Sequence, residues 1–449
     1  MFERSWHRDV RDMAQVAWPI VLINVGMQAM GFVDTLMVGP LGGAAIASVA
    51  LGNFYFFNVT IFGIGLIFAF DPVVSQAVGA GDHEAVARGV QRGLVLAVVM
   101  TVVSIVALAP AAPLFRWLGQ PDDLIDPTGV YVQRRLWGVL PMFLFVVLRQ
   151  ALQALGPVLP IIVAVVVGNL VNAAANWALI GGHAGMPALG VEGSGVATSI
   201  ASWVMAALLA WMAWPVLGSA LRPWRPAVLD RAPMWRMVAL GLPMAVQFFF
   251  ETFAFGVTAV LMGWMGTASL AGHEIALNLA AMTFMVPLGI SSAAAVVVGR
   301  AIGRGDMPAA RSDAMAAIVC GVGFMCLTAI AFLGVPEWLA TRFTREAATL
   351  AVAVTLIPLA GWFQVFDGLQ AVTSGVLRGT GDTRIPAILH LIAFWGIGVP
   401  LGVYLGFRTD YRERGLWMGL VAGLMAASLL QSARAFIRLR ADIQRVRVD

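Results

Sequence analysis

The sequence predicts an all-α polytopic membrane protein whose twelve transmembrane helices form two six-helix lobes, related by a pseudo-two-fold axis along the membrane normal. Three observations lead to this prediction. First, 60% of the 449 residues are hydrophobic and only 12% are charged, about half the charged fraction of a soluble protein. Second, apolar stretches of ~20 residues, the length needed to cross a ~30 Å hydrocarbon core, recur along the chain. Third, the first half of the sequence matches the second.

The apolar stretches are assigned in chain order as transmembrane helices. We expect them at residues 13–37, 45–72, 90–115, 130–154, 160–181, 191–215, 238–263, 271–299, 313–336, 350–376, 385–407 and 414–437. A mixed-charge segment, residues 1–12, precedes the first stretch without the pattern of a cleavable signal peptide. We therefore expect the first stretch to remain as a helix.

The basic residues, all of which are Arg, indicate the orientation of the chain in the membrane. Most of them fall in segments that are cytoplasmic if the N-terminus is cytoplasmic, as the positive-inside rule requires. We therefore expect both termini on the cytoplasmic side of the lipid bilayer. The formal net charge of +4 comes largely from these short loops and does not indicate nucleic-acid binding.

The two halves of the chain match at a shift of 224 residues, which becomes 225 or 226 from residue 160 onward. This shift places Pro19 on Pro243, and without a gap it places the loop GAGD at 79–82 on the loop GRGD at 303–306. Parallel repeats of this kind belong to transporters that rock two helix bundles about a central site. A duplicated protein without transport activity is the alternative.

The duplication and a Pro- and Arg-rich segment between its halves predict the domain boundaries. We expect an N-lobe at residues 1–217, a cytoplasmic linker at residues 218–236 and a C-lobe at residues 237–449.

Three acidic residues lie within the predicted transmembrane helices: Asp34 in the first, Glu251 in the seventh and Asp367 in the tenth. A charge at membrane depth costs several kcal/mol, so such a residue is a functional candidate by default. A buried carboxylate of this kind suits a group that takes up and releases a proton or a cation. The alternative is a protonated carboxyl group that is hydrogen-bonded between helices.

Each of these acids belongs to a polar stripe, because other polar residues recur at spacings of three and four on the same helix face. The stripes contain Asn24, Gln28, Gly31 and Asp34 or Thr35 in the first helix; Gln247, Glu251 and Thr258, more thinly spaced, in the seventh; and Gln364, Asp367, Gln370 or Ala371, and Ser374 in the tenth. Polar faces of membrane helices point towards protein or a wet cavity. Gln28, Gln247 and Gln364 are therefore secondary site candidates.

The fifth and sixth helices add neutral polar residues. Asn172 and Asn176 are four residues apart and share a face, and Thr198 follows in the sixth helix. Amide oxygens suit Na⁺ or a hydrogen-bonded water, while Asp34 would supply the negative charge. Asparagine also serves as a hydrogen-bonding contact between membrane helices, and spacing alone does not separate the two roles.

Two further acids are secondary candidates because they lie closer to helix ends. Asp71 directly precedes Pro72, and Glu274 lies near the start of the eighth helix. Interfacial capping or loop packing is the favoured role for both.

One motif offers an alternative interpretation of the protein as an enzyme. Asp122, Asp123 and Asp126 form a DDxxD pattern, which can hold Mg²⁺ against a diphosphate, but it occurs once, in an outward loop ahead of a helix. A helix start accounts for it better than a metal site does. The sequence has no P-loop and no GxSxG motif, so it encodes neither ATP-driven transport nor serine hydrolysis.

Several stretches resemble the multidrug and toxic compound extrusion (MATE) family, most closely its NorM-like bacterial branch. They are WPIVLINVGMQAMGFVDTLMVGPLG, AVGAGD, GNLVNAAANW, TFMVPLGISSAAAVVVGRAIGRGD and SGVLRGTGDTRIP, and they cover essentially the whole chain in the order and spacing of that family. The resemblance implies a twelve-helix, two-lobe exporter in the bacterial cytoplasmic (inner) membrane. Relatives export cationic or amphiphilic compounds in exchange for H⁺ or Na⁺.

The resemblance also implies roles for individual residues. Asp34 matches the first-helix aspartate of the family, and Asn172, Asn176 and Thr198 match its cation-site partners in the N-lobe. Glu251 and Asp367 match the C-lobe acids implicated in cation coupling and drug binding. Asp71 stands where NorM-like members are usually apolar, and Glu274 stands where Gln is common in the HQxALN motif. Because both residues are ionisable, these two departures from the family pattern leave open how many ions are coupled to each transport cycle.

We therefore expect a cation-coupled antiporter that works by alternating access, without a cofactor or enzymatic activity and as a monomer. The drug and the coupling ion would compete for the same buried negative charges. The alternatives are a lipid or metabolite flippase of the same superfamily and a membrane-embedded prenyl-transferring enzyme. A flippase for phosphate headgroups needs a positively charged cavity, whereas the intramembrane charges here are acidic.

Overall fold

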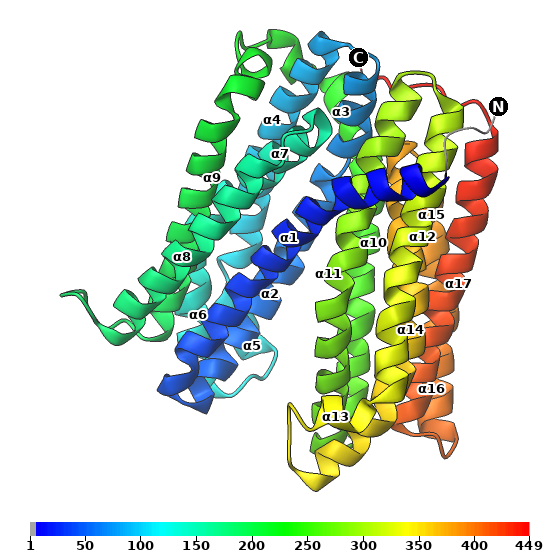
Figure 1. Cartoon of the computed structure of the whole chain (residues 1–449). Helices are drawn as coiled ribbons and strands as arrows, with labels where there is room; N and C mark the ends of the chain where they lie inside the picture. Colours follow the sequence, from blue (N-terminus) through cyan, green and yellow to red (C-terminus); the bar gives the residue numbers. More distant parts are fainter. Residues whose placement is uncertain (1–5, 449) are drawn as a thin grey trace. The chain divides into compact units, whose positions relative to one another are not determined.

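The computed structural model of the chain describes residues 6–448, and within them every regular element is a helix (Figure 1). Twelve helical spans in this range are long and apolar enough to cross a membrane, so the predicted fold class and number of transmembrane helices are confirmed. The elements are α1 (Trp6–Val38), η1 (Gly39–Leu41), α2 (Gly43–Ile67), α3 (Phe70–Gly79), α4 (His83–Leu108), α5 (Ala111–Trp117), α6 (Asp122–Arg135), η2 (Leu136–Gly138), α7 (Val139–Leu155), α8 (Leu159–Gly181), α9 (Val191–Leu221), η3 (Pro226–Leu229), α10 (Arg231–Met265), α11 (Thr267–Gly303), α12 (Met307–Gly334), α13 (Pro336–Ala340), α14 (Ala347–Gly379), α15 (Arg384–Leu391), η4 (Ile392–Gly398), α16 (Val399–Arg408) and α17 (Glu413–Arg440).

Several membrane spans are interrupted rather than continuous, which the sequence did not predict. The second span breaks between α2 and α3, the fourth contains the 3₁₀ turn η2, and the eleventh contains the π-helical segment η4. The third span was expected to reach residue 115 but ends at Leu108, and Pro110 caps a separate helix, α5. Proline lacks the amide N–H that would continue the helical hydrogen bonds.

The duplication is visible in matching loop geometry. Asp82 and Asp306 cap α4 and α12, and each carboxylate accepts a hydrogen bond of 3.0 Å from the backbone N–H three residues later. The preceding glycines, Gly81 and Gly305, have φ angles of 68° and 74°, in the left-handed region that glycine enters at low cost. The repeated sequence therefore builds the same turn twice.

The contacts divide the chain into two compact units, and neither is a continuous stretch of sequence. Unit 1 contains residues 1–21, 75–81 and 246–447, and unit 2 contains residues 22–74, 82–245 and 448–449. The divisions at Val21 and Val246 fall inside α1 and α10, shortly after the prolines at 19 and 243. The predicted linker at 218–236 contains the end of α9, η3 and the start of α10.

Unit 1 is organised around α14, which packs against α11, α12 and α17 (Figure 1). Its buried apolar residues come mainly from these helices. In unit 2, α9 takes the corresponding place and packs against α6, α7 and α8. The polar residues of the candidate site come from α8, α9 and α14 of these helices and also from α1, α10 and α15.

Candidate functional site

Asp34 lies at the centre of a buried polar cluster in unit 2. Its carboxylate is 2% exposed and comes from the last turns of α1, while its partners come from α8 and α9. Oδ1 accepts hydrogen bonds from the amide nitrogens of Asn172, at 2.9 Å, and Asn176, at 2.7 Å. Oδ2 lies 2.8 Å from the hydroxyl of Thr198. The structure thus brings together all four residues of the predicted N-lobe site.

The partners of Asp34 are also bonded to one another. The amide nitrogen of Asn176 lies 3.2 Å from the Oδ1 atom of Asn172, and the Asn172 amide lies 3.5 Å from the Thr198 hydroxyl. All three donors are neutral, so they satisfy the charged form of the carboxylate without cancelling its charge. Such a cluster keeps a negative charge available to a mobile cation.

One oxygen in this cluster is unused. Oδ1 of Asn176 is buried and has no hydrogen-bond partner. Buried polar atoms are normally paired, so an unpaired acceptor beside a carboxylate marks a place where a cation or a proton donor can bind. A hard cation such as Na⁺ prefers oxygen ligands, which Asn176, Asp34 and Thr198 could provide.

The two acids predicted for the C-lobe both belong to unit 1. Asp367 on α14 is 7% exposed, and the side chain of Glu251 on α10 is 18% exposed. The two carboxylates are close enough to interact electrostatically. Two like charges in a buried site oppose each other, so binding of a cation or a proton there is favoured.

A buried histidine beside Glu251 was missed by the sequence analysis. His390 on α15 is fully buried, and its Nε2 atom lies 3.5 Å from Oε2 of Glu251. Its Nδ1 atom lies 3.3 Å from the amide nitrogen of Gln370, which belongs to the polar stripe of α14. The signal was present, because an ionisable histidine inside the apolar segment 385–407 meets the same criterion as the acids.

The secondary glutamines have different surroundings. Gln28 is exposed, although it shares a stripe with Asp34. Gln247 is buried one turn before Glu251, and its amide nitrogen has no hydrogen-bond partner. Oε1 of Gln364 accepts hydrogen bonds from Thr283, at 2.8 Å, and Thr328, at 2.7 Å, and thereby links α11, α12 and α14. Gln247 is thus the glutamine best placed to act with a predicted acid.

The remaining acids lie apart from these clusters or near helix ends. Asp71 is buried in the first turn of α3, and Glu274 is exposed on α11. Asp122 and Asp123 occupy the first turn of α6, where the helix dipole stabilises negative charge. Asp126 of the DDxxD pattern lies 3.9 Å from Arg116 and is largely exposed. Within residues 6–448, no group of three His, Cys, Asp or Glu side chains could hold a metal ion.

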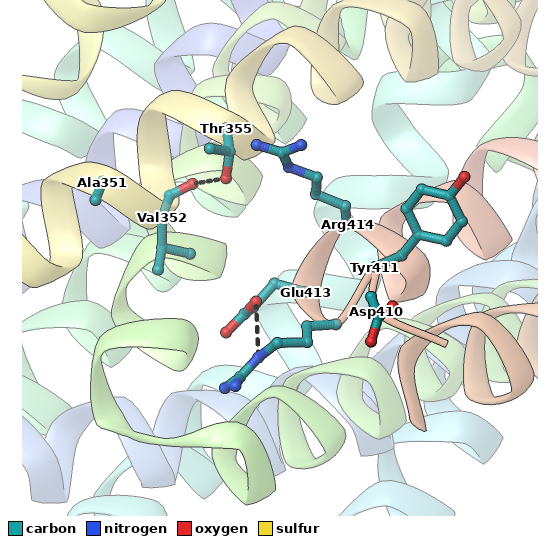
Figure 2. Close-up of a pocket in the computed structure, with 8 residues that line it drawn as sticks. Ala351, Val352, Thr355, Asp410, Tyr411, Glu413 and Arg414 are labelled. Atoms are coloured by element: carbon teal, nitrogen blue, oxygen red, sulfur yellow. Dashed lines mark hydrogen bonds and ion pairs between the residues drawn. The ribbon is translucent and has the colours of Figure 1, made fainter. Parts of the chain in front are cut away.

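A separate cavity of about 280 Å³ lies at one end of unit 1 (Figure 2). The first turns of α14 and the turn between α16 and α17 line it, with Arg412 Nε 3.6 Å from Glu413 Oε2. Thr355 in its wall precedes Asp367 by twelve residues of helix, or about 18 Å. None of the predicted site residues lines this cavity, so it is not the candidate site.

A model of the MatE family matches the chain twice, at residues 19–178 and 243–404. The second match begins at Pro243, which the internal shift pairs with Pro19.

Full-length relatives and solved structures agree with this match. The chain is 36% identical over 447 residues to a probable multidrug resistance protein NorM of Mesorhizobium japonicum, covering 96% of this chain and 94% of the relative. It is 32% identical over 439 residues to the multidrug resistance protein MdtK of Edwardsiella ictaluri, covering 96% of each. The crystal structure of the eukaryotic MATE transporter AtDTX14 superposes with a TM-score of 0.88 at 20% identity, covering 97% of this chain and 98% of that one.

Proposed function

Because the chain belongs to the MatE family, a family of multi-pass membrane transporters, we propose that it exports cationic or amphiphilic compounds in exchange for H⁺ or Na⁺. The observation that carries this proposal is the pair of buried acidic clusters, one around Asp34 and one around Glu251 and Asp367. Buried acids within apolar helices are costly and serve ion or substrate binding by default.

The mechanism follows from the charge of these clusters. A cationic compound that enters from the cytoplasm or inner leaflet is held by the carboxylates of Glu251 and Asp367. In the outward-open state H⁺ or Na⁺ binds the acids, including Asp34, and displaces the compound. An ion shifts an equilibrium between two states only by its different affinity for them, so the surroundings of the acids must change during the cycle.

The membrane potential is sufficient to drive this exchange. One elementary charge that moves down ~100 mV releases about 2.3 kcal/mol. This free energy corresponds to a roughly fifty-fold concentration gradient of the exported compound. We place the protein in the bacterial cytoplasmic membrane with both termini in the cytoplasm, because arginines are concentrated in the segments that this orientation leaves inside. We expect the monomer to be the functional unit.

The test is transport of cationic dyes in proteoliposomes on which Na⁺ and pH gradients are imposed separately. We expect export to follow at least one of the two gradients and to stop when the gradient is dissipated. Asp34→Asn removes the negative charge but keeps the size of the side chain, so we expect the variant to lose its response to the gradient. Dye movement that is independent of both gradients in the unsubstituted protein would contradict antiport.

A further inference from the structure

His390 lies 3.5 Å from a predicted coupling acid, Glu251, and the mechanism above gives it no role. It lies on α15, two residues before the π-helical segment η4 begins at Ile392. π-Helical segments inside membrane helices are rare and often mark functional sites. The imidazole is fully buried, with Nε2 3.5 Å from Oε2 of Glu251.

The neighbours of the His390 ring determine which of its two nitrogens carries the proton. The amide nitrogen of Gln370 can only donate, so the His390 Nδ1 atom 3.3 Å away accepts. In the neutral ring the proton therefore lies on Nε2, which faces the carboxylate of Glu251 and has no hydrogen-bond partner of its own. The Nε2–H of His390 thus lies on the side of the ring nearest Glu251, with Nε2 3.5 Å from Oε2.

Aromatic contacts hold the ring in this orientation. Phe394, one turn later, stacks on the imidazole with centroids 4.6 Å apart. Trp395 donates a hydrogen bond of 3.2 Å to the carbonyl of Phe250, the residue before Glu251. These contacts fix the segment that follows His390 to the turn of α10 that carries the acid.

The charged and polar groups around His390 come from three neighbouring helices, α10, α14 and α17. Glu251 faces it from α10, and Asp367 on α14 interacts with Glu251. From α17, the neutral Gln431 donates to the carbonyl of Pro386, and Arg434 is paired with Asp382 at 2.6 Å. Arg378, two turns beyond Gln370 on α14, has interaction partners of its own. Among these groups, the carboxylate of Glu251 is therefore the unpaired charge that faces the imidazole.

We propose that His390 makes the acidic site of unit 1 a proton site and excludes Na⁺ from it. Na⁺ requires oxygen ligands, whereas the group that faces Glu251 from α15 is the imidazole N–H of His390. A proton needs no set of oxygen ligands. When the imidazole and the carboxylate of Glu251 together gain one H⁺, their net charge changes from −1 to 0. A cationic substrate is then held by fewer negative charges and is released more readily. This inference rests on the proposed function and names its coupling ion for this site.

The role of His390 can be tested by transport measurements on a variant and a matched control. His390→Gln keeps a polar side chain but replaces the titratable ring with an amide whose oxygen can bind Na⁺. We expect export driven by a pH gradient to fall roughly tenfold, within the usual range for coupling between two ligands, and export driven by Na⁺ to rise. His273→Gln is the control, because His273 is equally buried in unit 1 but accepts its hydrogen bond, of 3.2 Å, from Trp417. Unchanged pH-driven export by the His390→Gln variant would overturn the proposal.

An ion-binding measurement tests the same proposal without transport and without a His390 variant. Purified Asp34→Asn protein lacks the unit 2 carboxylate, so an ion that raises its Tm must bind elsewhere. We expect Na⁺ and K⁺ at equal ionic strength to give the same Tm. A Na⁺-specific rise in Tm that disappears on adding Glu251→Gln would overturn the proposal. Absence of dye export by the unsubstituted protein would contradict the antiporter function. The comparison of Tm in Na⁺ and K⁺ would still show whether Na⁺ binds the acids of unit 1.

Discussion

At the scale of single residues, Asp34 shows how a membrane protein keeps a charge in its interior. Two amide groups and one hydroxyl donate to its carboxylate, and no donor brings a positive charge. Burying an unpaired charge costs several kcal/mol, and hydrogen bonds to a charged acceptor offset ~1.5–3 kcal/mol each. The remaining negative charge is what a cation can bind.

The hydroxyl of Thr198 provides a direct test of this cluster. Thr198→Val keeps the shape of the side chain but leaves Oδ2 of Asp34 without its donor. We expect this to cost about 1–3 kcal/mol of stability, measured as a lower Tm in detergent. Thr198→Ser retains the hydroxyl and should stay close to the unsubstituted protein. Equal Tm values for the Val and Ser variants would show that Thr198 does not hold the carboxylate.

The sequence predicted the members of this cluster but not the way they bond. The spacing of Asn172 and Asn176 placed both on one face of α8, and the structure joins both to Asp34. Which amide atoms face the carboxylate depends on packing between three helices, which spacing does not encode. Gln28 shares the stripe of Asp34 and is nevertheless exposed, because a helical face is wider than the few atoms that one carboxylate can contact.

At the scale of elements, glycines let neighbouring helices approach closely. A Cβ atom added at Gly419 on α17 would lie 2.3 Å from the Cα atom of Gly402 on α16. Small residues at such contacts are characteristic of membrane helix pairs, because backbone packing replaces the hydrophobic driving force of water. The approach of α17 to α16 and η4 in turn helps fix the eleventh span, to which His390 belongs.

The packing of α16 against α17 predicts a large effect from a small substitution. Gly419→Ala forces the two backbones apart, and we expect a cost of about 1–3 kcal/mol, seen as a lower Tm. Gly323→Ala on α12 is the matched control, because an added Cβ atom there has no heavy atom within 4 Å. Alanine favours a helix over glycine by ~1 kcal/mol, so the control should be neutral or more stable. Similar losses in both variants would refute the close-packing explanation.

The sequence was less informative about interruptions within the helices. Hydropathy and length identified all twelve spans, because the cost of an unsatisfied backbone in lipid imposes long apolar helices. The break between α2 and α3 and the π-helical segment η4 leave the hydropathy unchanged, so composition does not reveal them. His390 was missed for a related reason, since its neighbours in the segment are almost all apolar and form no polar stripe.

At the scale of the whole molecule, the duplicated sequence supplies two units that each contain a buried acidic cluster. The clusters are not copies of each other. Asp34 is surrounded by neutral donors, whereas Glu251 is accompanied by a second acid and a histidine. We propose that the two clusters divide the tasks of the transport cycle, with the unit 1 cluster binding both the substrate and the proton. The lobe boundaries at 217 and 237 also stay a prediction.

The central claim is that buried carboxylates of unit 1 bind the exported cation, and dye export by a doubly neutralised variant tests it most directly. Glu251→Gln and Asp367→Asn together remove both negative charges and keep the side-chain sizes. Glu337→Gln is the control, since Glu337 on α13 is an exposed acid of the same unit that is not a site candidate. With membrane insertion verified for both proteins, we expect the double variant to lose dye export in proteoliposomes and the control to retain it. Full export by the double variant would contradict this account.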